Sequence, residues 1–176
     1  LLAVCSIMMK ILMIFSYFTD GFAYAGEALT GRYIGAKDGP MVRQTVRWTF
    51  VWSMGIALIF MGIYHFAGVP MLKMMTSDMS VVAAAEGYIP WLLLMPVMGC
   101  AAFTWDGIYI GATASKAIRN SMLWAVVAFF AVWAAGLAFP DLSAEGSMHL
   151  LMGAYFAHLL ARTVYLTVRY KALIHI

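Results

Sequence analysis

The chain has 176 residues, of which 64% are hydrophobic and 11% charged, and its mean hydropathy is +0.87. An average soluble domain is about half apolar and about a quarter charged, so this composition excludes an ordinary soluble domain and indicates an integral membrane protein. The net charge of +3 suits anionic lipid headgroups at a membrane surface and does not indicate binding to nucleic acid.

Five apolar segments are long enough to cross a bilayer as helices, which takes about 20 residues each. Unbroken apolar runs such as 122–139 do not fit the alternating strands of a membrane β-barrel. We therefore predict an all-α, polytopic transmembrane helix bundle that forms a single domain over residues 1–176. In chain order, the five segments are residues 1–34, 48–66, 88–112, 121–139 and 148–168.

Basic residues lie in alternate connections between these segments. Cytoplasmic loops keep an excess of Lys and Arg, so the first segment is predicted to run from outside to inside and the C-terminus to be cytoplasmic. An N-terminus outside, with no signal peptide before it, leads us to expect further helices upstream of Leu1. The basic connections contain Arg32, Lys37, Arg43, Arg47, Lys116, Arg119, Arg169 and Lys171, whereas the others hold Lys73, Asp78, Glu86, Asp141 and Glu145.

Two carboxylates, Asp20 and Glu27, lie inside the first apolar segment. An ionised carboxylate at membrane depth costs about 2.5 to 3.5 kcal/mol on insertion scales, so such residues usually face a bundle interior or a watery cavity. Their seven-residue spacing places both on nearly the same helix face. We expect them to line one cavity, with the alternative that Glu27 forms a static buried pair with a cation.

A third membrane carboxylate, Asp106, lies in the segment 88–112. A desolvated carboxylate can exchange protons, and an ionised one can coordinate Na⁺. Thr104, Trp105 and Tyr109 surround Asp106 in the sequence and offer hydrogen bonds or aromatic contacts. Asp106 is therefore the leading candidate for cation coupling, with Thr104 and Tyr109 as further cavity candidates.

Glycine and proline suggest how these segments pack. Small residues four apart let two membrane helices approach closely, and such pairs occur in both acidic segments. Pro90 and Pro96 remove backbone donors, which predicts a bend or local opening in the third segment. The glycine pairs are Gly31 with Gly35 and Gly107 with Gly111.

Motifs for enzyme chemistry are missing from the sequence. Its four histidines lack metal-ligand spacing, and it contains no Ser/His/Asp set, Walker loop or dinucleotide-binding glycine turn. We therefore expect no enzyme activity, no cofactor and no resident metal. Cys5 and Cys100 both fall within apolar segments and are expected to act as small packing residues.

Two stretches carry a family resemblance. Residues 20–38, DGFAYAGEALTGRYIGAKD, and residues 106–122, DGIYIGATASKAIRNSM, resemble two signatures of the multidrug and toxic compound extrusion (MATE) transporters, in the DinF-like subfamily. The resemblance covers essentially the whole chain. It implies a twelve-helix transporter of two lobes, in which this chain forms the C-terminal lobe from about the eighth helix to the twelfth.

The resemblance also implies a function. Such transporters sit in the cell (inner) membrane and export organic cations or other amphipathic compounds by alternating access, in antiport with H⁺ or Na⁺. Asp106 matches an acidic position tied to cation coupling in NorM-like members, so Na⁺ at Asp106 is one expectation. The aspartate on which DinF-like members chiefly rely belongs to the first lobe. The implied partners are the lipid bilayer, small amphipathic or cationic substrates and the missing N-terminal lobe.

Two other functions remain open from the sequence. A lipid-linked oligosaccharide flippase of the same superfamily would need basic residues inside its cavity, and only Lys10 and Arg162 fall within the apolar segments. A structural membrane bundle without transport would hold Asp20, Glu27 and Asp106 in static pairs.

Overall fold

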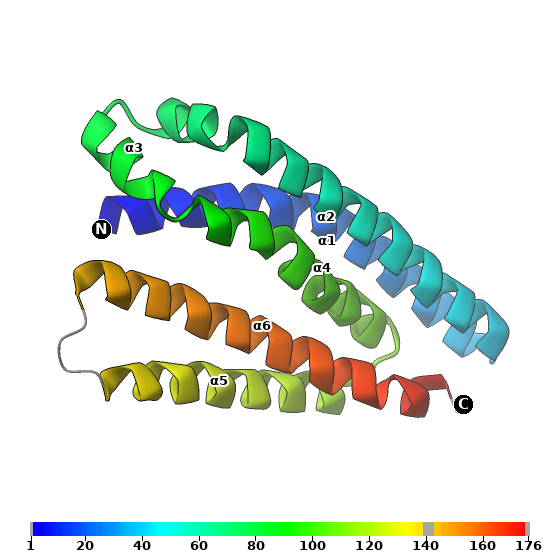
Figure 1. The fold of residues 1–176 in the computed structure, drawn as a ribbon. Coiled ribbons are helices and arrows are strands. Elements are labelled where there is room, and N and C mark those ends of the chain that lie inside the picture. Colours follow the sequence, from blue (N-terminus) through cyan, green and yellow to red (C-terminus); the bar gives the residue numbers. More distant parts are fainter. Residues whose placement is uncertain (1, 139–142, 175–176) are drawn as a thin grey trace.

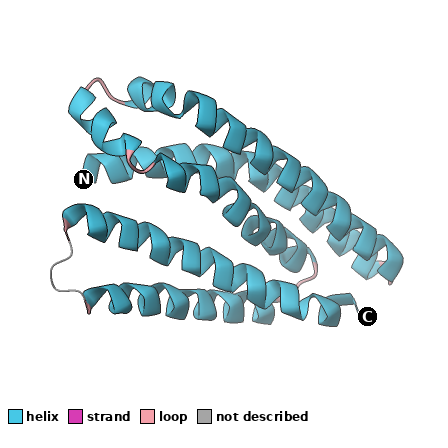
Figure 2. Cartoon of the chain, viewed as in Figure 1, coloured by secondary structure: helices cyan, strands magenta, loops and turns pink. Residues whose placement is uncertain are grey.

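The computed structural model describes residues 2–138 and 143–174, which form α-helices joined by short loops (Figures 1 and 2). Five of the helices are long and apolar enough to cross a membrane, and the described residues contain no strand. The predicted all-helical bundle with five spans is confirmed. The helices are α1 (Leu2–Gly35), α2 (Gly39–Met75), α3 (Met79–Glu86), α4 (Ile89–Gly111), α5 (Ser115–Leu137) and α6 (Ala144–Ile174).

Several helices begin before the apolar segments that predicted them. The clearest case is α2, which begins at Gly39 and not near residue 48. The Asp38 side chain caps this helix by accepting the Met41 N–H at 3.1 Å, and Pro40 occupies the first turn, where a missing N–H costs nothing. Hydropathy marks the part of a helix that suits lipid, whereas capping residues decide where the helix starts.

Of the bend or local opening predicted at Pro90 and Pro96, the opening is wrong because α4 is a continuous helix, whereas the bend stays a prediction. Pro90 lies in the first turn of α4, where its missing N–H has no intrahelical partner to lose. Pro96 lies inside α4, and the helix continues through it to Gly111. The residues between the second and third apolar segments are also mostly helical, because α2 continues past Pro70 to Met75 and α3 fills most of the remainder.

The bundle consists of two helix pairs held together by α4. Helices α1 and α2 form an antiparallel pair, α5 and α6 form another, and α4 lies between them (Figure 1). Helix α4 packs against α1, α2 and α6, whereas α5 contacts mainly α6. The position of α6 against α4 therefore decides how the second pair sits on the rest of the bundle.

Buried apolar side chains form two separate clusters along the bundle. The first includes Phe15 of α1, Tyr64 of α2 and Leu159 of α6. The second includes Trp105 of α4 and Leu166 of α6. Polar side chains are also buried in the bundle, among them Ser53, Thr104 and Arg162, and Asp106 is half-buried.

A membrane-embedded acidic cavity as candidate functional site

Close packing of α1 against α4 brings the two acidic segments together. A Cβ atom at position 107 would lie 2.7 Å from the carbonyl carbon of Ala23, which is nearer than such atoms approach in proteins. Gly31 of α1 also packs closely against Gly111. A Cβ atom added at position 31 would lie 3.1 Å from the carbonyl oxygen of Gly111. Glycine at these positions allows the backbones to touch, as in other membrane helix pairs.

A cavity of about 190 Å³ opens beside this contact. Asp20 and Glu27 of α1 line it together, and Asp106 of α4 lines it from the facing helix. The volume is enough for several water molecules or a small charged group. Ala23, Tyr24, Phe103, Gly107 and Ile110 complete the lining. The structure thus brings three of the five predicted site residues into one cavity.

Arg162 of α6 forms an ion pair with Asp106 across the interface between α4 and α6. The side chains are 9% and 18% exposed, respectively, so both charges are largely buried. Oδ1 of Asp106 and Nε of Arg162 are buried and have no hydrogen-bond partner within the part of the chain that the structure describes. The pair therefore rests on a single nitrogen and a single oxygen.

The partnership between Asp106 and Arg162 was not foreseen from the sequence. Arg162 was recognised as a basic residue inside an apolar segment, but it was not assigned to any acid. The general tendency of intramembrane charges to pair with one another was the available signal. The sequence offers a buried pair with a cation as an alternative for Glu27, whereas in the structure the paired carboxylate is Asp106.

The other two predicted site residues lie outside the cavity lining. Thr104 is fully buried, and its hydroxyl has no hydrogen-bond partner among the described residues. Tyr109 is 1% exposed and donates its hydroxyl hydrogen bond to the Leu166 carbonyl oxygen at 2.7 Å. Trp105 likewise donates from Nε1 to the Thr167 hydroxyl at 2.8 Å. The side chains of Trp105 and Tyr109 therefore link α4 to α6 by hydrogen bonds. Neither side chain lines the acidic cavity.

The carboxylates share the cavity without converging on one point. Over residues 2–138 and 143–174, no group of three or more His, Cys, Asp or Glu side chains is arranged to hold a metal ion. Na⁺ at Asp106 thus remains a prediction, and it would need oxygen ligands from backbone or water besides the carboxylate.

Two other hollows have a different character. The larger, about 730 Å³, lies between α5 and α6 and is lined mainly by apolar side chains such as Trp124, Leu160 and Val164. A hollow of about 320 Å³ lies between α1 and α2 beside Trp48 and Trp52. Exposed apolar surface of this kind suits lipid chains or further protein, whereas the cavity at Asp106 combines small size with ionisable groups.

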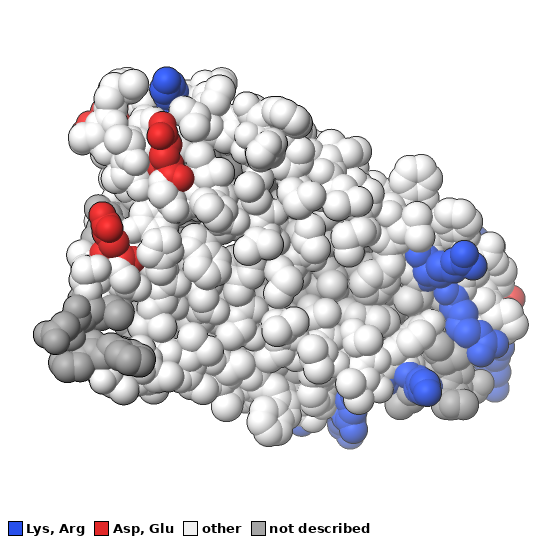
Figure 3. All heavy atoms as spheres, viewed as in Figure 1, with Lys and Arg blue, Asp and Glu red and all other residues white. Residues whose placement is uncertain are grey.

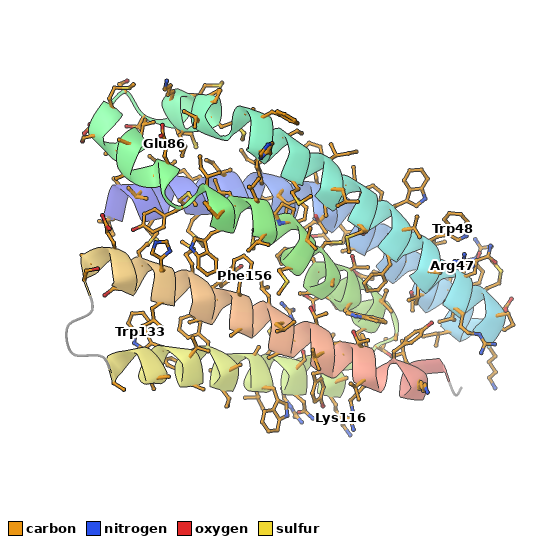
Figure 4. All side chains as sticks on the ribbon, in the orientation of Figure 1. Arg47, Trp48, Glu86, Lys116, Trp133 and Phe156 are labelled. Carbon is orange, nitrogen blue, oxygen red and sulfur yellow. The ribbon has the colours of Figure 1, made fainter. Side chains whose placement is uncertain are left out.

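Charges separate along the bundle. Most of the visible Lys and Arg gather at one end of the molecule and most of the visible Asp and Glu at the other, where one basic side chain also lies (Figure 3). Figure 4 shows Arg47 and Lys116 toward one end and Glu86 at the opposite end. The basic end contains the end of α1 and the beginnings of α2 and α5. The acidic cavity lies between these two ends, on helices that are long and apolar enough to cross a membrane.

These features define a multi-pass membrane protein with an acidic cavity between two of its helices. Residues 1–134 match the family model described as MatE, and the chain belongs to this family, which is a family of transporters. The match includes Asp20, Glu27 and Asp106, whereas Arg162 lies beyond it.

The chain is also similar to DNA damage-inducible protein F of Escherichia coli strain K12. The two are 36% identical over 129 residues, which make up 73% of this chain and 28% of that relative. This similarity supports the DinF-like assignment within the MATE superfamily. The chain spans 28% of the length of the relative that it matches. No solved structure matches the chain.

Proposed function

We propose that this chain is part of a secondary active transporter that exports organic cations or other amphipathic compounds in antiport with H⁺ or Na⁺. The observation that carries the proposal is the cavity at membrane depth that Asp20, Glu27 and Asp106 line. Carboxylates are costly in that position and usually mark an ion or substrate pathway. Membership of a transporter family supports the same reading.

Antiport through this cavity follows from competition for negative charge. A proton or Na⁺ and an organic cation are all attracted to the same carboxylates, so binding of one disfavours the other. Each bound species stabilises the conformation of the transporter that binds it better. Movement of one helix bundle relative to the other then exposes the site to one side of the membrane and afterwards to the other. The cavity in this chain is one part of such a pathway.

We further propose that the chain forms the C-terminal lobe, from about the eighth helix to the twelfth, of a two-lobe protein in the inner membrane. The gathering of basic residues at one end of the bundle (Figure 3) supports a cytoplasmic location for that end and for the C-terminus. An N-terminal lobe would supply the facing wall of the substrate pathway.

The charge of the cavity favours cationic substrates over a lipid-linked oligosaccharide. A flippase for an anionic headgroup would need an available basic side chain in the cavity. Arg162 is engaged by Asp106, and Lys10 lies in the opposite half of α1 from Glu27. A static structural bundle is disfavoured because Asp20 and Glu27 form no ion pair with any described residue.

The test is transport by the full-length protein in proteoliposomes. Movement of tetraphenylphosphonium would be followed under an imposed pH or Na⁺ gradient, with rates expressed per folded molecule. Asp106→Asn should abolish gradient-driven transport, and Asp106→Glu should retain part of it. Asp38→Asn is the matched control, because Asp38 caps α2 away from the cavity. Full gradient-driven transport by Asp106→Asn would remove Asp106 from the coupling mechanism.

A further inference from the structure

Arg162 pairs with Asp106, one of the three carboxylates that line the cavity. Its side chain is buried near the middle of α6 and is not among the residues that line the cavity. Asp106 lines the cavity and holds Arg162 at the same time. The Asp106 carboxylate therefore lies between an internal guanidinium on one side and the cavity on the other.

The pair is only half formed. Arginine and a carboxylate commonly make two parallel hydrogen bonds, and here the atoms for a second bond, Nε of Arg162 and Oδ1 of Asp106, are buried without a partner in the described residues. Unsatisfied polar atoms in an apolar interior are unfavourable. This arrangement holds Asp106 without binding it as firmly as two bonds would.

The charges around Asp106 are few. Helix α1 presents Asp20 and Glu27 across the cavity, and α6 presents Arg162, with His158 one turn before it. Helix α2 has no Asp, Glu, Lys or Arg between residues 47 and 73, and α5 has none after residue 119. A cation that enters the cavity therefore meets two carboxylates, Asp20 and Glu27, that are unpaired within the described chain, and a third, Asp106, that is already paired with Arg162.

Among the described residues, the same pair is one of four polar side-chain links between α4 and α6. The other three are hydrogen bonds that involve no carboxylate and no arginine, from Trp91 to His149, from Trp105 to Thr167 and from Tyr109 to Leu166. Of these links, the pair of Asp106 with Arg162 is the one that includes a residue lining the acidic cavity, so a cation that enters the cavity acts on this link directly. Because α5 packs mainly on α6, a change at this link acts on both helices together.

We propose that Arg162 is an internal competitor for the cavity's cation, a guanidinium that holds Asp106 until an incoming cation or proton replaces it and thereby loosens α6 from α4. This inference rests on the proposed cation transport. Once Asp106 is neutralised, the buried guanidinium has lost its counter-charge, which an apolar interior strongly disfavours. The α5–α6 pair must then shift, and the binding event is converted into movement.

The first test separates competition from simple support of the fold. In the full-length protein, Arg162→Met removes the competing charge while keeping an unbranched apolar side chain. We expect KM for tetraphenylphosphonium to fall at least about fivefold, the lower end of typical coupling between linked sites. We expect kcat to fall as well, because binding no longer releases α6. Arg162→Lys keeps a competing charge and should retain most of the wild-type KM. An unchanged KM in folded Arg162→Met would overturn the proposal.

The second test does not depend on transport. Dicyclohexylcarbodiimide reacts with protonated carboxyl groups in apolar surroundings, and mass spectrometry of peptides locates the adduct. A carboxyl group left alone in an apolar site takes up a proton, so Arg162→Met should increase labelling at Asp106 but not at Asp20 or Glu27. Asp106→Asn is the blank. Equal labelling of Asp106 in wild type and Arg162→Met would overturn the pairing.

The two tests fail in distinguishable ways. If wild-type protein moves no tetraphenylphosphonium, the proposed function is contradicted for that cation, whereas the labelling still decides whether Arg162 holds Asp106. If transport is robust but neither KM nor labelling responds to Arg162→Met, the competitor proposal alone is overturned. Should Arg162→Met fail to fold, Arg162→Ala combined with external guanidinium replaces it. Guanidinium should then restore protection of Asp106 from labelling, and a failure to protect would count against the proposal.

Discussion

Gly111 of α4 lies against the backbone of Glu27 in α1, the residue whose side chain lines the acidic cavity. A Cβ atom at position 111 would lie 2.9 Å from the carbonyl carbon of Glu27, and one turn earlier Gly107 meets Ala23 in the same manner. These two contacts fix how closely α1 and α4 approach. The separation of their carboxylates therefore depends on the absence of two side chains.

Gly107→Ala and Gly111→Ala should each force the two helices apart. Overpacking of a close interface typically costs about 1 to 3 kcal/mol, so we expect a lower free energy of unfolding for both variants, measured by thermal unfolding of the full-length protein in detergent. Gly62→Ala in α2 is the control, because nothing lies within 4 Å of its would-be Cβ atom. Equal stability of Gly107→Ala and Gly62→Ala would contradict the close contact.

Glycine spacing in the sequence predicted this contact only in part. Both Gly-x-x-x-Gly pairs were expected to mediate packing, and Gly107, Gly111 and Gly31 do so. Gly35 has nothing within 4 Å of its would-be Cβ atom. Residue spacing shows which positions share a helix face, but the length of the actual contact depends on how far two helices run side by side.

The partner of Asp106 was beyond sequence reasoning for a related reason. Helical periodicity placed Asp20 and Glu27 together on one face, and the structure shows them in one cavity. Arg162 lies on another helix, 56 residues from Asp106 along the chain, and no local pattern connects the two. Tyr109 is close to Asp106 in sequence, yet its hydroxyl is directed to α6. Tertiary packing, and not local sequence, determines the partner of Asp106 and the direction of the Tyr109 hydroxyl.

A pH effect is expected at the short helix α3, outside the membrane-spanning segments. Hydrogen bonds from the Ser80 hydroxyl and backbone N–H lower the pKa of Asp78 below its ordinary value of 3.8. Because this pKa is depressed in the folded state, the cap stabilises α3 at neutral pH, and the stabilisation is lost as pH falls through the lowered pKa.

Hydrogen exchange of the full-length protein would measure this effect. Corrected for the intrinsic pH dependence of exchange, amides in the first turn of α3 should lose protection below about pH 4 in wild type. Asp78→Asn retains a capping oxygen and should show weaker dependence on pH, whereas Asp78→Ala should be unprotected throughout. Identical profiles for wild type and Asp78→Ala would show that the Asp78 cap does not hold α3.

Neutral links between α4 and α6 should affect stability without affecting cation binding. Tyr109→Phe removes the hydrogen bond to the Leu166 carbonyl oxygen, and a typical loss of this kind is about 1 kcal/mol. We expect lower stability with an unchanged KM for tetraphenylphosphonium. Tyr17→Phe is the control, because the Tyr17 side chain is exposed. A large KM change in Tyr109→Phe would instead place its hydroxyl in the binding site.

The three cavity carboxylates should separate into two classes when they are neutralised. Asp20 and Glu27 form no ion pair within the described residues, so Asp20→Asn and Glu27→Gln should raise KM for tetraphenylphosphonium with little loss of stability. Asp106→Asn leaves a buried arginine without its counter-charge, and breaking a buried pair in this way typically costs about 3 to 5 kcal/mol. The measurements are unfolding of the full-length protein in detergent and uptake kinetics in proteoliposomes.

A double variant makes the distinction specific to Arg162. Asp106→Asn combined with Arg162→Met removes both charges, so most of the stability lost in Asp106→Asn should return, because apolar replacement of a whole buried pair is often neutral. Transport should not return with it, since Asp106 is still absent. The same Arg162→Met change should not rescue Asp20→Asn or Glu27→Gln. Equal rescue of all three would show that Arg162 acts on the cavity as a whole and not through Asp106.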